Sequence, residues 1–332
     1  IIINSLRKAG VENVICYSYG TPGNIQSKIS KQVADAVGYE WHFVEYTEEK
    51  WGNLHRKGII DEYVDLSFQG VSTPHLQDFL AVYELKQKGT IKSDDIFVPG
   101  HALDFVAGSH LTNTDIELNS KESAINRVIQ KFIDSKINEQ LFEKIYESFK
   151  GSPSQFQEYV NWQERQAKFI VNSCRVYEFF GFNFRLPFWD KDFVEFWMNI
   201  SYEDRLKRNL FLKAEQKGIL MDELVAIPFE DELIPKSDRK KISQQLKKII
   251  PNFLIVALLR LTGRKQQLAE GLNQIFAQKG ETVEDIIGPI EDFPEKSQEM
   301  IKPFLKRYPF QMGYHQLSAI YAVRRAIDNK KE

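Results

Sequence analysis

The stretch Asp95-Ile-Phe-Val-Pro-Gly100-His-Ala-Leu-Asp104-Phe-Val-Ala-Gly108-Ser-His-Leu111 decides which fold we expect for this chain. An apolar run typical of a β-strand, residues 96–98, leads into Gly100, and a carboxylate follows at Asp104. In open α/β sheets, ligands bind outside the carboxyl ends of parallel strands, where a glycine lets backbone N–H groups approach an anion and a carboxylate can hold magnesium. The same order of residues also occurs in ordinary turns, so the preceding elements must decide between the two interpretations.

Helices and strands alternate along the residues that precede this stretch. The patterns predict helices over residues 1–9, 26–37 and 74–88, a helix beginning near Glu48, and strands over residues 14–19, 41–46 and 96–98. Gly10 and Gly38 are expected to end the first two helices. This alternation is typical of parallel βαβ units, and it predicts a doubly wound parallel sheet over residues 1–113.

Only helical patterns remain after about residue 115. They cover residues 123–137, 139–150, 155–180 and 314–328, which predicts a helical subdomain over residues 114–332. The chain opens inside a helix with no strand before it. We therefore expect a first strand and its phosphate-binding loop to precede Ile1.

Four separate segments, taken in order, resemble the synthetase domain of the asparagine synthase family. Members of this family are PP-loop ATP pyrophosphatases. The segments are Tyr17-Ser18-Tyr19-Gly20 with the helix after it, Val71-Ser72-Thr73-Pro74, Gly100-x-x-x-Asp104-x-x-x-Gly108, and residues 172–190, a helix followed by Gly181-Phe-Asn-Phe-Arg185-Leu-Pro187-Phe188-Trp-Asp190. The resemblance covers roughly residues 1–240. It implies a ligase that uses ATP and Mg²⁺ to activate a carboxylate as an acyl-adenylate, which ammonia or an amine then attacks.

The resemblance also assigns roles to individual residues. Asp104 would hold the magnesium ion on the departing pyrophosphate, and the Gly100 backbone would face the phosphates. Ser18, Tyr19 and Gly20 would line the nucleoside side. Ser72 and Thr73 would cap a helix beginning at Pro74, whose N-terminus would face the α-phosphate. The cation that approaches the phosphates has four candidates: Lys207, Arg208, Lys213 and Lys236.

The departures from the family pattern are informative too. The family's Ser-Gly-Gly-x-Asp-Ser loop would lie before Ile1, so these 332 residues alone should not turn over ATP. His101 and Phe105 stand where asparagine synthetases carry glutamates, which favours a bulkier carboxylate than aspartate, such as a sugar acid. No glutaminase domain is present in these residues, so the ammonia donor is expected to be a separate glutaminase or free ammonia.

Two other functions stay open at this point. His75, His101, Asp104 and His110 could form the metal site of a hydrolase, although the His-x-x-Asp spacing is unspecific. A non-catalytic nucleotide-binding remnant is the other alternative. Arg185 could anchor a substrate carboxylate, but a turn contact with Asp190 is the simpler interpretation.

Composition limits the remaining classes. A net charge of −2 argues against a dedicated nucleic-acid binder. Cys16 and Cys174 are predicted to be buried thiols in a reducing compartment, and with no signal peptide visible we expect a cytoplasmic protein. Residues 236–265 carry nine Lys or Arg and one Asp around an apolar run. This segment predicts a core helix with a basic face or, alternatively, a weak membrane-surface contact.

Overall fold

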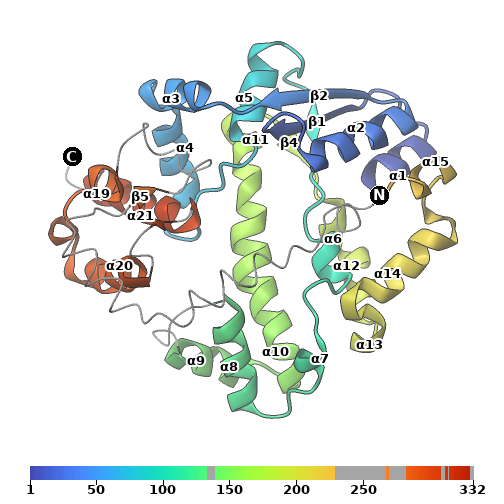
Figure 1. Ribbon diagram of the computed structural model, residues 1–332. Helices are drawn as coiled ribbons and strands as arrows, with labels where there is room; N and C mark the ends of the chain where they lie inside the picture. The colour runs from blue at the N-terminus through green and yellow to red at the C-terminus, as the bar shows by residue number, and fades with distance from the viewer. Residues whose placement is uncertain (133–138, 229–266, 269–281, 308–310, 313, 330–332) are drawn as a thin grey trace. The chain divides into compact units, whose positions relative to one another are not determined.

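The computed structural model is a mostly helical α/β protein with small two-stranded parallel sheets (Figure 1). It describes residues 1–132, 139–228, 267–268, 282–307, 311–312 and 314–329. The chain divides into two compact units. The first unit contains residues 1–13 and 93–226, and the second contains residues 14–92 and the described residues from 227 onward.

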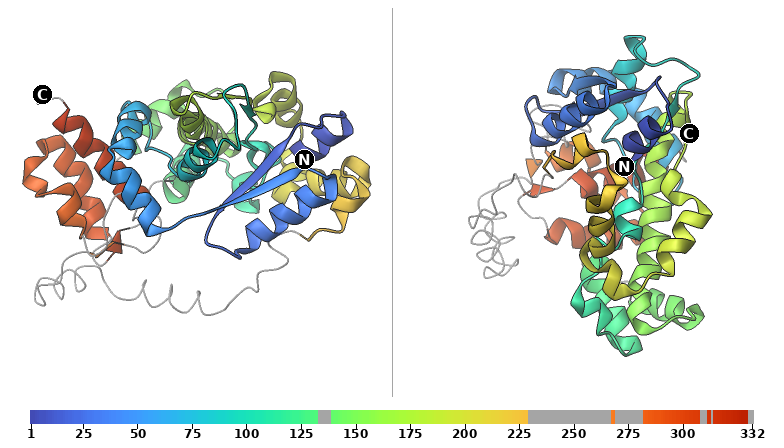
Figure 2. Two further views of the ribbon diagram at one scale, coloured as in Figure 1. Left: turned by 90° about the horizontal axis from the view of Figure 1, so that it is seen from above. Right: turned by 90° about the vertical axis from the view of Figure 1, so that its right-hand side faces the viewer.

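The second unit contains the one extended βαβ element among the described residues. Strand β1 (Ile15–Gly20) pairs in parallel with β2 (Glu40–Glu45), from Ile15 opposite Glu40 to Gly20 opposite Glu45. Helix α2 (Ile25–Val37) connects them and packs on both strands (Figure 2). Asn24 caps the start of α2, and Gly38 ends it in the left-handed conformation with φ of 73°. These elements confirm the pattern predicted for this part of the chain.

Helices make up the rest of the second unit. They are α3 (Glu48–Arg56), α4 (Ile59–Phe68), α5 (Phe79–Gln87), α19 (Val283–Ile287), α20 (Glu295–Arg307) and α21 (Tyr314–Asp328), and a short parallel pair joins β5 (Gln267–Leu268) to β6 (Gln311–Met312). The bounds of α21 match the prediction. The helix predicted from Pro74 is wrong at its start, because α5 begins at Phe79 after a turn in which Leu76 is buried.

The first unit is predominantly helical. Its elements are α1 (Ile2–Lys8), β3 (Ile96–Phe97), α6 (Leu103–Val106), α7 (Asn113–Ile116), α8 (Lys121–Phe132), α9 (Glu139–Ser148), α10 (Pro153–Val160), α11 (Arg175–Phe179), β4 (Asn183–Phe184), α12 (Lys191–Met198), α13 (Tyr202–Arg205), α14 (Asn209–Ala214) and α15 (Asp222–Val225). Between α10 and α11 the backbone stays helical through a π-helical stretch, Asn161–Ile170, and a short 3₁₀ turn, Val171–Cys174.

The arrangement of the third strand corrects the predicted sheet. Ile96–Phe97 pairs in parallel with Asn183–Phe184, so it belongs to a different two-stranded sheet from Ile15–Gly20. The pairing partner comes from the half of the chain that we expected to be helical throughout. The expected boundary at residue 113 falls inside the first unit. A single sheet over residues 1–113 is therefore not what the described strands form.

Candidate functional site

The segment that decided the fold prediction forms a compact turn in the first unit. We call residues 100–111 the Asp104 turn. Ala102 precedes α6 with a φ of 73°, a left-handed conformation that costs a residue with a Cβ on the order of 1 kcal/mol. Asp104 lies in the first turn of α6 with its side chain exposed, and Ser109 Oγ donates to its Oδ2 at 3.3 Å. The predicted carboxylate is thus presented to solvent on a strained backbone.

Gly108 brings this turn against a second strained segment. A Cβ at Gly108 would overlap the backbone carbonyl of Arg205, so only glycine allows this approach. Lys207 and Arg208 follow shortly after Arg205, and both are left-handed, with φ of 53° and 64°. We call these two residues the cationic turn. Two predicted site residues, Asp104 and Lys207, therefore lie on segments whose backbones touch.

Apolar packing holds the same segments together. Phe105, Val106 and Ala107 form a buried cluster with Trp197 of α12, and Leu210 and Phe211 of α14 pack against it. Lys213, another predicted cation, lies in the last turn of α14 with its side chain exposed. Arg208 is partly buried.

A buried ion pair lies beneath the Asp104 turn. Arg205 is 1% exposed, and its Nη1 and Nη2 donate to the two carboxylate oxygens of Glu158 at 2.6 and 2.9 Å. Tyr202 Oη donates to Glu158 Oε2 at 2.8 Å, and His110 Nε2 lies 3.3 Å from Glu158 Oε1. We call these four residues the Glu158 network. Burial alone would raise the pKa of Glu158, but His110 and Arg205 outweigh it and lower the pKa to about 2.

A second buried carboxylate fixes the far end of the turn. Asp115 is fully buried and accepts hydrogen bonds from Thr112, Arg127 and Lys131. Lys131 Nζ also donates to the His110 carbonyl at 2.6 Å. Burial would raise the pKa of Asp115, but these donors lower it to about 2. Sequence reasoning missed both buried carboxylates. Glu158 lies within the helix predicted over residues 155–180, whereas Asp115 lies outside every predicted helix and its sequence signal is the capping-box spacing Thr112-x-x-Asp115.

Phe105 is buried in the described structure, and His101 is partly buried. Phe105 is 2% exposed and stacks on His110 with ring centroids 4.3 Å apart. His101 points toward residues 173–174, with Nε2 3.3 Å from Ser173 Oγ and Nδ1 3.7 Å from Cys174 Sγ. Burial lowers the pKa of His101, although Asp104 opposes the shift. The substitution at Phe105 therefore gives no support for a bulkier substrate.

The remaining predicted site residues belong to the second unit. Ser18, Tyr19 and Gly20 end β1, and Gly20 has a φ of 115° at the carboxyl edge of the strand pair. The Tyr19 ring stacks on Tyr46 at a centroid distance of 5.0 Å. Ser72 Oγ contacts the Thr73 carbonyl at 3.3 Å, and no helix begins there, so the predicted cap and its phosphate-facing N-terminus are wrong. Convergence of these residues with Asp104 stays a prediction.

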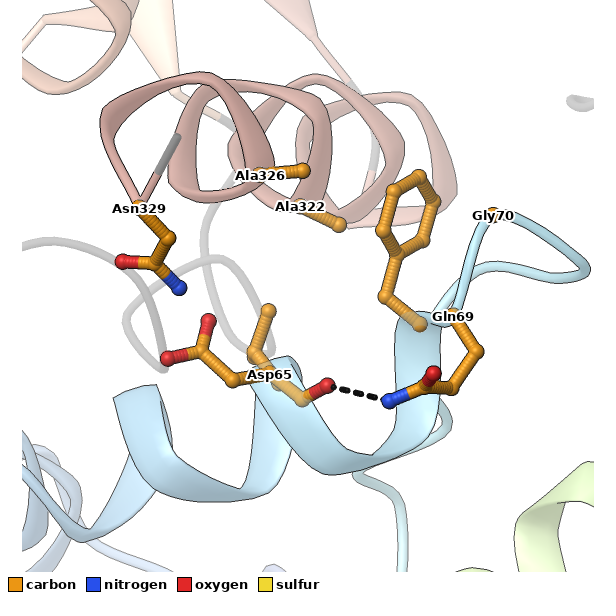
Figure 3. Close-up of a pocket in the computed structure, with 8 residues that line it drawn as sticks. Asp65, Gln69, Gly70, Ala322, Ala326 and Asn329 are labelled. Atoms are coloured by element: carbon orange, nitrogen blue, oxygen red, sulfur yellow. Dashed lines mark hydrogen bonds between the residues drawn. The ribbon is translucent and has the colours of Figure 1, made fainter. Parts of the chain in front are cut away.

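A pocket of about 360 Å³ lies between α4 and α21 in the second unit (Figure 3). Asp65, Gln69, Ala322 and Asn329 are among the residues that line it. The Asp65 carboxylate already accepts two hydrogen bonds from Arg325, at 3.0 and 2.6 Å. None of the predicted site residues lines this pocket, so it is not the predicted nucleotide site.

The side-chain arrangement limits the metal chemistry of the described residues. Within them, no three His, Cys, Asp or Glu side chains are grouped to hold a metal ion, so the cluster of the hydrolase alternative is not formed. His110 lies beside Glu158 instead. An exposed carboxylate such as Asp104 still suits Mg²⁺, which is commonly bound by one or two carboxylates together with substrate phosphates. Asp190 caps α12 through the amides of Asp192 and Phe193, and Arg185 donates to the Phe184 carbonyl.

No protein-family model matches this chain, and no curated protein matches its sequence. Both cysteines are free thiols, with Cys174 buried and Cys16 partly buried. None of the helices in the described ranges has the length and apolar character needed to cross a bilayer. Lys236 and the basic segment 236–265 lie outside the described residues.

Proposed function

We propose that this chain belongs to an ATP-dependent, amide-forming ligase that resembles the asparagine synthases. In this proposal Asp104 holds Mg²⁺ on the pyrophosphate that leaves ATP, and the cationic turn neutralises phosphate charge. The bond that forms first joins a substrate carboxylate to the α-phosphate, and the bond that breaks releases pyrophosphate. Ammonia or an amine then displaces AMP to give the amide.

The observation that carries the proposal is the backbone contact between Gly108 and Arg205. It places an exposed carboxylate, Asp104, and two consecutive cations, Lys207 and Arg208, on adjoining segments of one unit. A magnesium-bound polyphosphate needs both kinds of group. Left-handed backbone at Ala102, Lys207 and Arg208 adds support, since strained residues tend to cluster at functional sites.

The parallel pair β1–β2 with α2 gives further support to a nucleotide-binding α/β fold. Gly20 ends β1 at the edge where ligands bind in such folds. The separate pairing of β3 with β4 lends no support to a continuous doubly wound sheet of the PP-loop type, which stays part of the proposal only.

The substitution Asp104→Asn tests the assignment in the natural gene product that contains these residues. It removes the charge that would hold magnesium, so ATP–pyrophosphate exchange should fall by about 100-fold or more while the fold is kept. Asp94→Asn, at an exposed acid upstream of β3, is the matched control and should leave exchange unchanged. Near-normal exchange in Asp104→Asn would contradict the role of Asp104.

The same assay separates the alternatives. Exchange supported by aspartate alone would identify an aspartate-activating enzyme, and exchange supported by a uronic acid would identify a sugar-acid substrate. Binding of Mg²⁺-ATP without exchange under any of these conditions would favour a non-catalytic nucleotide-binding protein. Glutamine and ammonium, compared as nitrogen donors, would show whether a separate glutaminase is required.

A further inference from the structure

Arg205 contacts the Asp104 turn in two independent ways. Its guanidinium Nη1 donates to the Val106 carbonyl at 3.3 Å, and its own backbone packs against Gly108. The same side chain donates through Nε to the Ile200 carbonyl at 3.3 Å. Because Arg205 directly precedes the segment Leu206–Arg208, one residue contacts the Asp104 turn and leads into the cationic turn.

Glu158 fixes the orientation of this guanidinium. It comes from α10, an element remote in sequence from both turns, and accepts two parallel hydrogen bonds from Arg205. A bidentate carboxylate–guanidinium pair restrains both side chains in one plane. Tyr202 Oη donates to the same carboxylate, and the Tyr202 ring lies 5.0 Å from the Arg205 guanidinium.

We propose that Glu158 and Arg205 are a positioning pair that fixes the Asp104 turn against the cationic turn. The inference rests on the proposed function, because that function assigns the chemistry to Asp104 and Lys207. A buried ion pair contributes little stability relative to apolar side chains of the same size. The better physical explanation for the Glu158–Arg205 pair is therefore that it holds the two turns in one specific arrangement. Three left-handed non-glycine residues around the pair need such restraint, since a strained backbone persists only where its surroundings over-determine it.

Hydrogen exchange measured on the 332-residue chain tests the positioning role without any ligand. The amides of Val106, Ala107, Gly108 and Ser109 are hydrogen-bonded within the turn, to the carbonyls of Ala102, Leu103, Phe105 and Asp104. Glu158→Gln should accelerate their exchange by about tenfold or more, because the guanidinium loses its charged partner. Unchanged protection of these four amides in Glu158→Gln would overturn the proposal.

Two further variants and one control keep the test decisive if Glu158→Gln does not fold. Tyr202→Phe removes one donor to Glu158 and leaves the ion pair, so exchange should accelerate less than in Glu158→Gln. Glu158→Asp keeps the charge and should restore part of the protection. Asp65→Asn breaks the comparable pair with Arg325 in the second unit and should leave the four amides unchanged. Protection of the four amides in Tyr202→Phe and Glu158→Asp equal to that in Asp65→Asn would overturn the proposal.

Kinetics of the natural gene product separate positioning from a purely structural role. Misplacement of reacting groups by about 1 Å can cost roughly 100-fold in rate. Folded Glu158→Gln should therefore lower kcat by about 10- to 100-fold with a KM for ATP within about threefold of wild type, and Glu158→Asp should recover part of kcat. The two proposals can fail separately. If the wild-type gene product shows no ATP–pyrophosphate exchange but Glu158→Gln still accelerates amide hydrogen exchange in the Asp104 turn, the proposed function is refuted and the positioning role of Glu158 and Arg205 is supported.

Discussion

Among the described residues, bidentate carboxylate–guanidinium pairs join helices in both units, and two of them, Glu158–Arg205 in the first unit and Asp65–Arg325 in the second, differ in burial. Arg205 of the Glu158 network is 1% exposed, whereas the Arg325 side chain, which pairs with Asp65 between α4 and α21, is 28% exposed. Their hydrogen-bond lengths are alike, at 2.6 and 2.9 Å in the first and 3.0 and 2.6 Å in the second. Contact geometry alone therefore does not distinguish them.

The difference in burial changes what each pair requires. A buried carboxylate must find a partner for every lone pair, and Glu158 accordingly has Arg205, Tyr202 and His110 around it. Arg325 also contacts Asp61, but because the Asp65–Arg325 pair is partly exposed, water can replace much of the hydrogen bonding that each side chain gives the other. The buried pair therefore specifies one arrangement of its surroundings, while the half-buried pair tolerates change.

The strongest test of this contrast is Gly108→Ala, next to the buried pair. The new Cβ would overlap the Arg205 carbonyl, and φ at this position is 92°, so we expect a loss of about 2–5 kcal/mol in the free energy of unfolding. Urea denaturation followed by circular dichroism measures the loss. Gly181→Ala is the matched control, since φ is 84° there but nothing lies within 4 Å of the added Cβ. A similar loss in both variants would show that backbone conformation alone, and not the close approach, explains the cost.

The pH dependence of stability should differ between the two units. The pKa values of Glu158 and Asp115 are about 2 in the folded first unit, below ordinary values of 4.5 and 3.8. A carboxylate whose pKa is lower in the folded state than in the unfolded state stabilises the fold at pH values above its unfolded-state pKa. This stabilisation is lost as the pH falls toward the folded-state pKa, here about 2. At pH 6 these shifts correspond to roughly 3 kcal/mol for Glu158 and roughly 2 kcal/mol for Asp115.

Hydrogen exchange resolved by peptide, at several values between pH 5 and 2.5, compares the units directly. As the pH falls from 5 to 2.5, the free energy of global opening of the first unit, corrected for the intrinsic exchange rate, should fall by several kcal/mol. Glu158→Gln or Asp115→Asn should flatten the profile. An equal slope in the first unit with and without these carboxylates would assign acid sensitivity to other groups.

The sequence predicted local elements better than their pairing. The sequence predicted that Gly38 ends α2 and that β1, α2 and β2 alternate, because both features depend on residues close together in the chain. The partner of β3 was not readable: Asn183–Phe184 is a two-residue strand with no period of its own, and the pairing joins distant segments. The predicted start of α5 was also wrong, because the residues Ser72-Thr73-Pro74 favour a turn as strongly as they favour the N-terminal cap of a helix.

The candidate site was predictable only in its exposed part. Asp104 and Lys207 could be proposed from a motif and from charge, but the Gly108–Arg205 contact between their segments could not. The buried carboxylate Glu158 was missed because a charged residue in a helical pattern is normally exposed to solvent, and Asp115 was missed because it lies outside every predicted helix. Their burial follows from tertiary partners on two other helices: Tyr202 and Arg205 of α13 contact Glu158, and Arg127 and Lys131 of α8 contact Asp115.

The smallest expected effect is at the half-buried pair, where Asp65→Asn should cost under about 1 kcal/mol. Arg325 lowers the pKa of Asp65 through hydrogen bonding, while partial burial opposes the shift. Removing the charge leaves Arg325 with Asp61 at 3.3 Å, so the guanidinium keeps one carboxylate partner. Urea denaturation at pH 7 measures the change, with Asp61→Asn and the double variant completing a cycle. A loss above about 3 kcal/mol for Asp65→Asn alone would place this pair in the same energetic class as Glu158–Arg205, and burial would then not explain the difference between the units.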